Sequence, residues 1–137
     1  MMPDLRLLVV ADDPLARAGL AALLAAQAGV SVAGQTDSNA DLLGAVVAFL
    51  PDILIWDLGW EPSIRLEALA RFIEAGAPPV LALLGTTSLA GDARSAGARG
   101  LLGRNTNGAQ LAAAAAALMQ GLLVFDAEMA PASSPSP

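Results

Sequence analysis

Ile53-Leu54-Ile55-Trp56-Asp57-Leu58-Gly59 is the stretch that decides the fold, because a short apolar run ends abruptly at a carboxylate. Leu7-Leu8-Val9-Val10-Ala11 runs in the same way into Asp12-Asp13-Pro14. Such runs are typical of buried parallel strands that end at a site on the edge of a sheet. If the two strands are neighbours, Asp12 and Asp57 share a pocket that suits a divalent cation and a phosphoryl group.

Strands and helices are predicted to alternate along the chain. We predict strands at 5–11, 30–36, 53–56, 80–84 and 100–102, and helices at 14–27, 38–50, 64–75, 85–97 and 107–119. This alternation favours an α/β fold, a three-layer α/β/α sandwich around a five-stranded parallel sheet. In the flavodoxin-like strand order 2-1-3-4-5, the first and third strands lie side by side, and their carboxyl ends open on one crevice. Asp12, Asp13 and Asp57 are therefore expected in that crevice.

Local signals set the expected helix starts. Asp13 is a candidate N-cap followed by Pro14 at the first helical position. Ser38-Asn39-Ala40-Asp41 resembles a capping box and is predicted to open the second helix. Trp56 and Trp60 are interpreted as packing residues.

The composition indicates one folded domain. Of 137 residues, 55% are hydrophobic and 15% charged, as in a globule with a single core. We expect a domain at 1–126, followed at 127–137 by a Pro/Ser tail or truncated linker that is predicted to be disordered. No apolar run reaches the roughly 18–20 residues of a membrane span, and no basic segment suggests a signal peptide. The expected location is cytoplasmic, with no membrane partner.

Missing residue types exclude whole classes of chemistry. The chain has no cysteine, histidine, lysine or tyrosine, so thiol catalysis, serine–histidine triads, Schiff bases and lysine-dependent phosphate loops are excluded. A net charge of −6 works against direct binding to a nucleic-acid backbone. Carboxylates, hydroxyls, arginines and backbone amides are left for chemistry.

Several segments, in order, match one family. Residues 51–58 correspond to the family pattern P-D-[apolar]3-x-D-L, and residues 11–20 correspond to D-D-H-P-L-x-R-x-G-L. Residues 66–69 correspond to L-E-x-L, and residues 96–102 correspond to A-G-A-x-G-Y-L. Residues 122–126 correspond to the segment that precedes a linker in the family. With these motifs the chain resembles, from about Leu5 to Asp126, the receiver domain of two-component response regulators in the NarL/FixJ (LuxR-type) branch.

The resemblance implies a function and a set of site residues. Asp57 would accept a phosphoryl group from a sensor histidine kinase, and Mg²⁺ would be held by Asp12, Asp57 and the carbonyl of Gly59. Arg104 and Gly85 would contact the phosphoryl group. The domain would not be an enzyme, would form a homodimer, and would reach DNA only through an output domain absent from this chain. It would be the N-terminal regulatory part of a transcription regulator.

The sequence also departs from the family pattern at the site. In an ungapped alignment Ala11 takes the first acidic position, Asp12 the second and Asp13 the histidine, whereas a one-residue gap restores the pair as Asp12-Asp13. The family lysine falls on Arg104, and the hydroxyl residue of the fourth strand falls on Leu84, although Thr86 and Thr87 lie close by. The methionine–proline pair after the acceptor becomes Trp60-Glu61.

These departures predict an atypical receiver with a degenerate switch. A hydrogen bond to a charged group contributes about 1.5–3 kcal/mol, and moving a two-state switch from 1:99 to 99:1 needs about 5.5 kcal/mol. Losing the hydroxyl and replacing the lysine removes much of the free energy with which phosphorylation would move the switch.

Alternative interpretations stay open. The chain could be a phosphorylation-independent pseudo-receiver, a dimerisation or partner-binding module, with the alanine-rich run 112–117 as a packing face. A Mg²⁺-dependent phosphatase is disfavoured because Gly59 stands where its second aspartate would be. Arg104 could also be a surface residue that pairs with Asp92 or Asp126.

Overall fold

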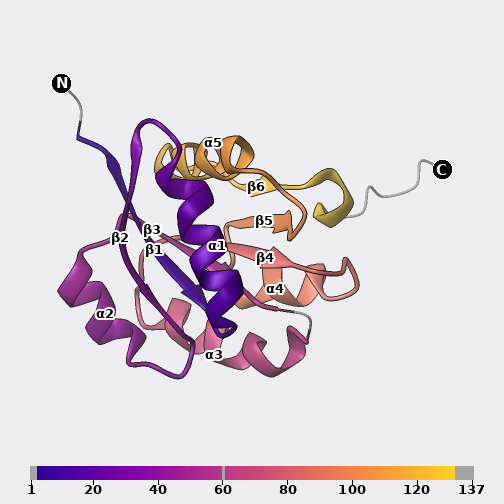
Figure 1. Cartoon of the computed structure of the whole chain (residues 1–137). Helices are drawn as coiled ribbons and strands as arrows, with labels where there is room; N and C mark the ends of the chain where they lie inside the picture. The colour runs from indigo at the N-terminus through magenta and orange to yellow at the C-terminus, as the bar shows by residue number, and fades with distance from the viewer. Residues whose placement is uncertain (1–2, 60, 132–137) are drawn as a thin grey trace.

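The fold is built on one parallel sheet with the strand order β2-β1-β3-β4-β5-β6 (Figure 1). The computed structural model describes residues 3–59 and 61–131. The strands are β1 (Leu5–Ala11), β2 (Val30–Thr36), β3 (Ile53–Asp57), β4 (Val80–Leu84), β5 (Gly100–Gly103) and β6 (Val124–Phe125). The helices are α1 (Pro14–Ala25), α2 (Leu42–Phe49), α3 (Ser63–Glu74), α4 (Ala90–Ala96), α5 (Gly108–Met119) and the 3-10 helix η1 (Ala127–Met129).

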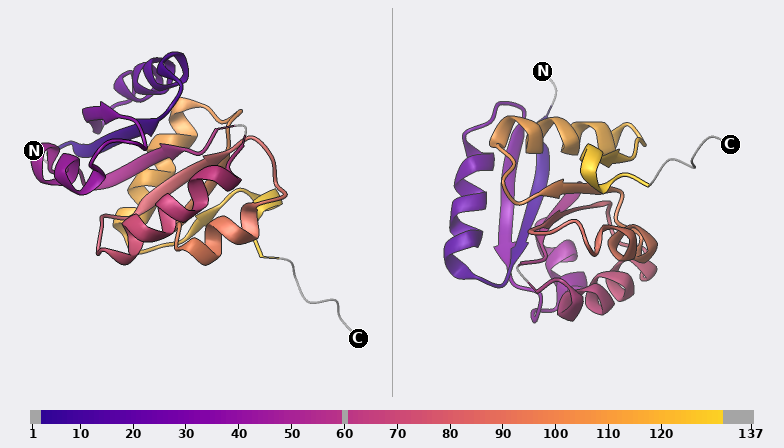
Figure 2. Two further views of the ribbon diagram at one scale, coloured as in Figure 1. Left: turned by 90° about the horizontal axis from the view of Figure 1, so that it is seen from below. Right: turned by 90° about the vertical axis from the view of Figure 1, so that its right-hand side faces the viewer.

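Helices cover both faces of the sheet, which confirms the three-layer α/β/α sandwich (Figure 2). Helices α1 and α5 pack on one face over the apolar side chains of alternate strand positions. Helices α2, α3 and α4 pack on the other face, where Trp56 of β3 is fully buried and meets Phe72 of α3 edge to face. Trp56 is therefore a packing residue, as predicted, whereas Trp60 lies outside the described residues.

Strand pairing confirms the predicted switch point. β1 lies between β2 and β3, with Ala11 opposite Asp57 and Val10 opposite Trp56. The guanidinium of Arg17 donates to the Ala11 carbonyl at 2.7 Å and holds the end of β1. Consequently the residues that follow β1 and β3 emerge at the same edge of the sheet.

A sixth, two-residue strand extends the expected five-stranded sheet. β6 pairs in parallel with β5, and the Asp126 amide donates to the Leu101 carbonyl at 2.8 Å. The chain then turns through η1, and Met129 is buried in the core. The division into a domain at 1–126 and a tail at 127–137 stays a prediction, and residues 132–137 lie outside the described part of the chain.

The predicted start of the second helix is wrong. α2 begins at Leu42 because Asp41 is its N-cap and accepts from the Gly44 amide at 3.0 Å. Ser38 bonds elsewhere, as the next subsection describes. The fourth helix likewise begins at Ala90 and not at 85, since Gly85 to Ser88 form a turn. In the described part of the chain, no helix combines the length and apolar character that crossing a membrane requires.

Candidate functional site

A pocket of about 260 Å³ opens at the carboxyl ends of β1 and β3. We call it the notch and define it by the residues that line it, Asp12, Asp13, Asp57, Gly59, Glu61, Ile64, Arg65 and Arg104. The structure thus confirms the geometric prediction that Asp12 and Asp57 share one pocket.

Asp57 lies on the inner wall of the notch with its side chain only 7% exposed. One carboxylate oxygen accepts the Gly59 amide at 2.9 Å, and the other accepts Nη2 of Arg104 at 2.9 Å. Gly59 has φ +78°, a conformation that favours glycine, and this turn brings its amide back to Asp57. Arg104 therefore pairs with Asp57 in this structure.

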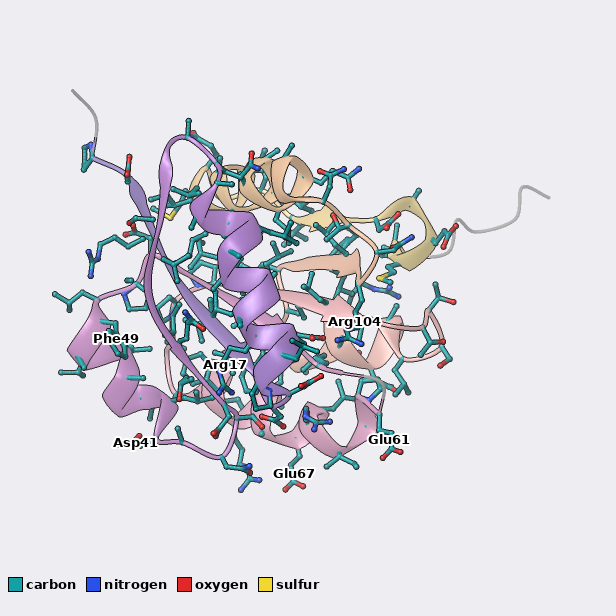
Figure 3. The ribbon with its side chains drawn as sticks, in the orientation of Figure 1. Arg17, Asp41, Phe49, Glu61, Glu67 and Arg104 are labelled. Carbon is teal, nitrogen blue, oxygen red and sulfur yellow. The ribbon has the colours of Figure 1, made fainter. Side chains whose placement is uncertain are left out.

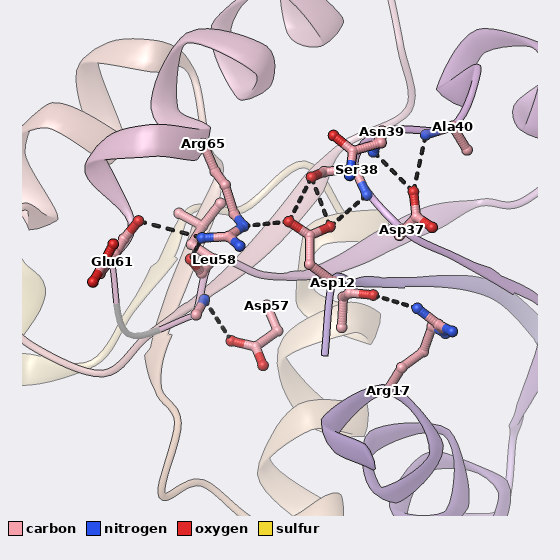
Figure 4. Close-up of polar contacts among 12 residues, drawn as sticks. Asp12, Arg17, Asp37, Ser38, Asn39, Ala40, Asp57, Leu58, Glu61 and Arg65 are labelled. Carbon is pink, nitrogen blue, oxygen red and sulfur yellow. Dashed lines mark hydrogen bonds and ion pairs between the residues drawn. The ribbon is translucent and has the colours of Figure 1, made fainter. Parts of the chain in front are cut away.

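Asp12 is held by two residues that sequence reasoning did not assign to the site. Ser38 donates its amide and hydroxyl to Oδ1 at 2.7 Å each, and Nε of Arg65 donates to Oδ2 at 2.5 Å (Figure 4). Burial raises the pKa of the Asp12 carboxyl, but the hydrogen bonds from Ser38 and Arg65 and the charge of Arg65 outweigh it, so the pKa lies below its usual value. Asp12 is held as a carboxylate.

The other expected residues lie at the rim of the notch or beyond it. Asp13 caps α1 by accepting the Leu15 amide at 3.0 Å, as predicted. Glu61 is exposed, and its backbone carbonyl accepts from Arg65 at 3.3 Å. Gly85 does not line the notch. It lines the adjacent cavity together with Thr86 and Thr87, and Arg104 stands on the wall shared by both.

A sequence signal for Arg65 does exist. Arg65 stands in the first turn of α3, which has no acidic residue there and no side-chain cap. The positive end of the helix dipole disfavours a cation in the first turn. An arginine at such a position is expected to face an anion, which here is Asp12. Ser38 carried no such signal, because its place in a capping pattern explained it otherwise.

As arranged, the carboxylates of the Mg²⁺ site that the resemblance implied are paired with arginines. The oxygens of Asp12 and Asp57 accept from Ser38, Gly59 and two arginines, so a Mg²⁺ ion would compete with these donors. Among residues 3–59 and 61–131 no three acidic, histidine or cysteine side chains form a group that could hold a metal ion. The ligand set of Asp12, Asp57 and the Gly59 carbonyl stays a prediction.

Comparisons with known proteins agree with this architecture. No family model matches the chain. The chain is 29% identical over 122 residues to the transcriptional regulatory protein LiaR of Bacillus subtilis (strain 168), and the match covers 85% of this chain. It covers 57% of LiaR, so this chain spans little more than half the length of that relative.

Solved structures give the same picture. The signal receiver domain of the response regulator NarL from Mycobacterium tuberculosis is 25% identical, with a TM-score of 0.73 over 88% of this chain and 99% of that one. A LuxR-family two-component response regulator from Aurantimonas sp. SI85-9A1 is 24% identical, with a TM-score of 0.75 and 92% coverage of both chains. Strand order, the paired strand-end aspartates and these similarities agree. The chain has the fold of the response-regulator receiver domains and is similar to those of the NarL and LuxR branch.

Proposed function

We propose that this chain is the regulatory receiver part of a transcription regulator, and that it acts as an interaction module whose shape does not depend on phosphorylation. Its partners would be a second copy of itself and an output domain that carries the DNA-binding surface. The domain would have no catalytic turnover and would work in the cytoplasm.

The ion pair between Arg104 and Asp57 carries this proposal. Its two side chains are only 17% and 7% exposed, so little water screens the 2.9 Å contact. A phosphoryl group on Asp57 would have to displace Arg104 or accept it as a partner. The residue at the end of β4 is Leu84, a buried apolar side chain without a hydroxyl. A phosphoryl group on Asp57 would therefore have few side chains to reposition, and phosphorylation would change the structure little.

Phosphorylation of Asp57 is the second candidate. It is favoured by the position of Asp57 at the end of β3, in a pocket that opens to solvent. In this case Arg104 would stand beside the phosphoryl group with its guanidinium fork, which suits anionic oxygens. Coupling to the output would still be weak, since the hydrogen bond from the fourth strand is missing.

One experiment separates the two candidates. The protein is incubated with acetyl phosphate and Mg²⁺, its intact mass is measured, and its self-association is followed by analytical ultracentrifugation. The proposal expects no Asp57-dependent phosphoryl adduct and the same association for wild type and Asp57→Asn. An adduct that is absent from Asp57→Asn, together with a changed association state, would overturn it in favour of the second candidate.

A further inference from the structure

Arg65 joins the end of β1 to the loop between β3 and α3. Its Nε bonds Asp12, while its Nη1 lies 3.3 Å from the Glu61 carbonyl and 3.5 Å from the Leu58 carbonyl (Figure 4). Its guanidinium also lies against Gly59, with Nη1 3.5 Å from where a Cβ would be. One carboxylate and nearby backbone carbonyls are the kind of oxygen ligands that a hard divalent cation binds.

Hydrogen-bond donors take up most of the acceptor sites of Asp12. A carboxylate offers about four lone-pair sites. Three donors face them at Asp12: the Ser38 amide at 2.7 Å, the Ser38 hydroxyl, whose one hydrogen serves both oxygens at 2.7 and 2.8 Å, and Arg65 at 2.5 Å. An ion that binds Asp12 would therefore compete with these donors, of which Arg65 is the charged one.

Each of the two inner carboxylates of the notch is paired with an arginine. Asp12 faces Arg65 and Asp57 faces Arg104, whereas Asp13 and Glu61 also line the notch. A divalent ion would add a charge of +2 to this group, in surroundings where the side chains of Asp12 and Arg65 are each 23% exposed. An ion would therefore compete with the two arginines for the inner carboxylates.

We propose that Arg65 is a built-in cation of the notch, occupying the place a divalent metal ion would need and holding the β3–α3 loop against β1. This inference rests on the proposed function, because a receiver that signals without phosphorylation needs its site held closed without a metal. Arg65 is a positioning residue, and removing its charge should create an affinity for divalent ions that the wild type lacks.

The test compares two arginines of the same helix. Arg65→Met removes the charge in the notch, and Arg71→Met removes the same charge from the outer surface of α3, where Arg71 pairs with Glu67 at 3.6 Å. Glu67 points away from the body of the molecule (Figure 3). Mn²⁺ serves as the probe, since it broadens the backbone amide resonances of residues near its site, and Mg²⁺ is then added in competition.

In Arg65→Met we expect saturable broadening of the Ser38 and Gly59 amides, reversed by Mg²⁺, with binding about tenfold or more tighter than in the wild type. Arg71→Met should behave as the wild type does. Arg65→Lys, which keeps the charge, should also exclude the ion. If Arg65→Met fails to fold, Arg65→Ala also removes the charge and the donors and should show the same gain.

Two results would overturn the inference. The first is Mn²⁺ broadening in Arg65→Met that equals that in Arg71→Met, and the second is wild-type binding at the notch as tight as in Arg65→Met. Neither result decides whether Asp57 is phosphorylated, because the acetyl phosphate experiment reads that separately. Failure of this inference and failure of the proposed function can therefore be told apart.

Discussion

Helix α3 carries two arginine–carboxylate pairs in different surroundings. Arg65 meets Asp12 at 2.5 Å, with both side chains 23% exposed, across 53 residues of sequence. Arg71 meets Glu67 at 3.6 Å, one turn apart on the helix surface, with side chains 71% and 81% exposed. The first pair joins separate parts of the fold, whereas the second adds little to a helix already formed. The same two chemical groups thus differ in role because the two pairs differ in solvent exposure and in the sequence separation that they bridge.

The largest loss of stability is expected from a substitution at Arg104, because its ion pair with Asp57 is the more deeply buried one. Arg104→Met removes the charged donor of the Asp57 carboxylate, 7% exposed, which keeps the Gly59 amide. Removing one partner of a buried pair costs about 3 kcal/mol. Urea unfolding followed by tryptophan fluorescence measures the loss, and Asp57→Asn in the same background should restore part of it. A loss below about 0.5 kcal/mol would mean that this pair behaves like a surface pair.

Arg65→Met should rank second. Asp12 keeps its bonds from Ser38, so the expected loss is that of one charged hydrogen bond, about 1.5–2 kcal/mol. The same urea experiment applies. Equal midpoints for Arg65→Met and wild type would show that the bridge between β1 and the β3–α3 loop is not formed in solution.

Ser38→Ala should lower the stability by about 1 kcal/mol, since the amide of residue 38 still donates to Asp12. The loss should depend on pH. Asp12 has a folded pKa below its ordinary value of 3.8, so its stabilising contribution is complete well above that value and is lost as the pH falls through the folded pKa. The difference in unfolding free energy between Ser38→Ala and the wild type should therefore become smaller as the pH falls. If this free-energy difference grew below pH 3.8, the Ser38 hydroxyl would not be stabilising the ionised carboxylate of Asp12.

Arg71→Met gives the smallest effect, below about 0.5 kcal/mol, and this effect should fade with added salt. It is the control for charge removal on α3. A loss comparable to that of Arg65→Met would remove the contrast between the two pairs.

Strand ends could be predicted from the sequence, whereas the partners of the side chains there could not. Apolar runs that stop at Asp12 and Asp57 placed both residues, because pairing of β1 with β3 follows from the strand order. Ser38 and Arg65 reach Asp12 from 26 and 53 residues away, and their contacts depend on loop paths that periodicity does not specify.

The short strand β6 and the cap of helix α2 were not predicted from the sequence for a different reason. β6 has two residues, too few for an alternating pattern, and its place depends on pairing with β5 and on the packing of Val124 and Phe125 against the core. At α2 the sequence predicted a capping box that opens at Ser38, whereas Asp41 caps the helix and the Ser38 hydroxyl bonds Asp12. Arg104 had three possible acidic partners in the sequence, and only the fold brings it to Asp57.

The side-chain Nε–H resonance of Arg65 tests the central claim most directly. It is followed by ¹H–¹⁵N spectroscopy of the wild-type protein during a Mg²⁺ titration. With Arg65 bonded to Asp12, the resonance should stand apart from those of the exposed arginines, exchange slowly with water, and stay unchanged up to millimolar Mg²⁺. A resonance that moves to the position of the exposed arginines as Mg²⁺ saturates would contradict the account, because the metal ion would then have displaced the guanidinium.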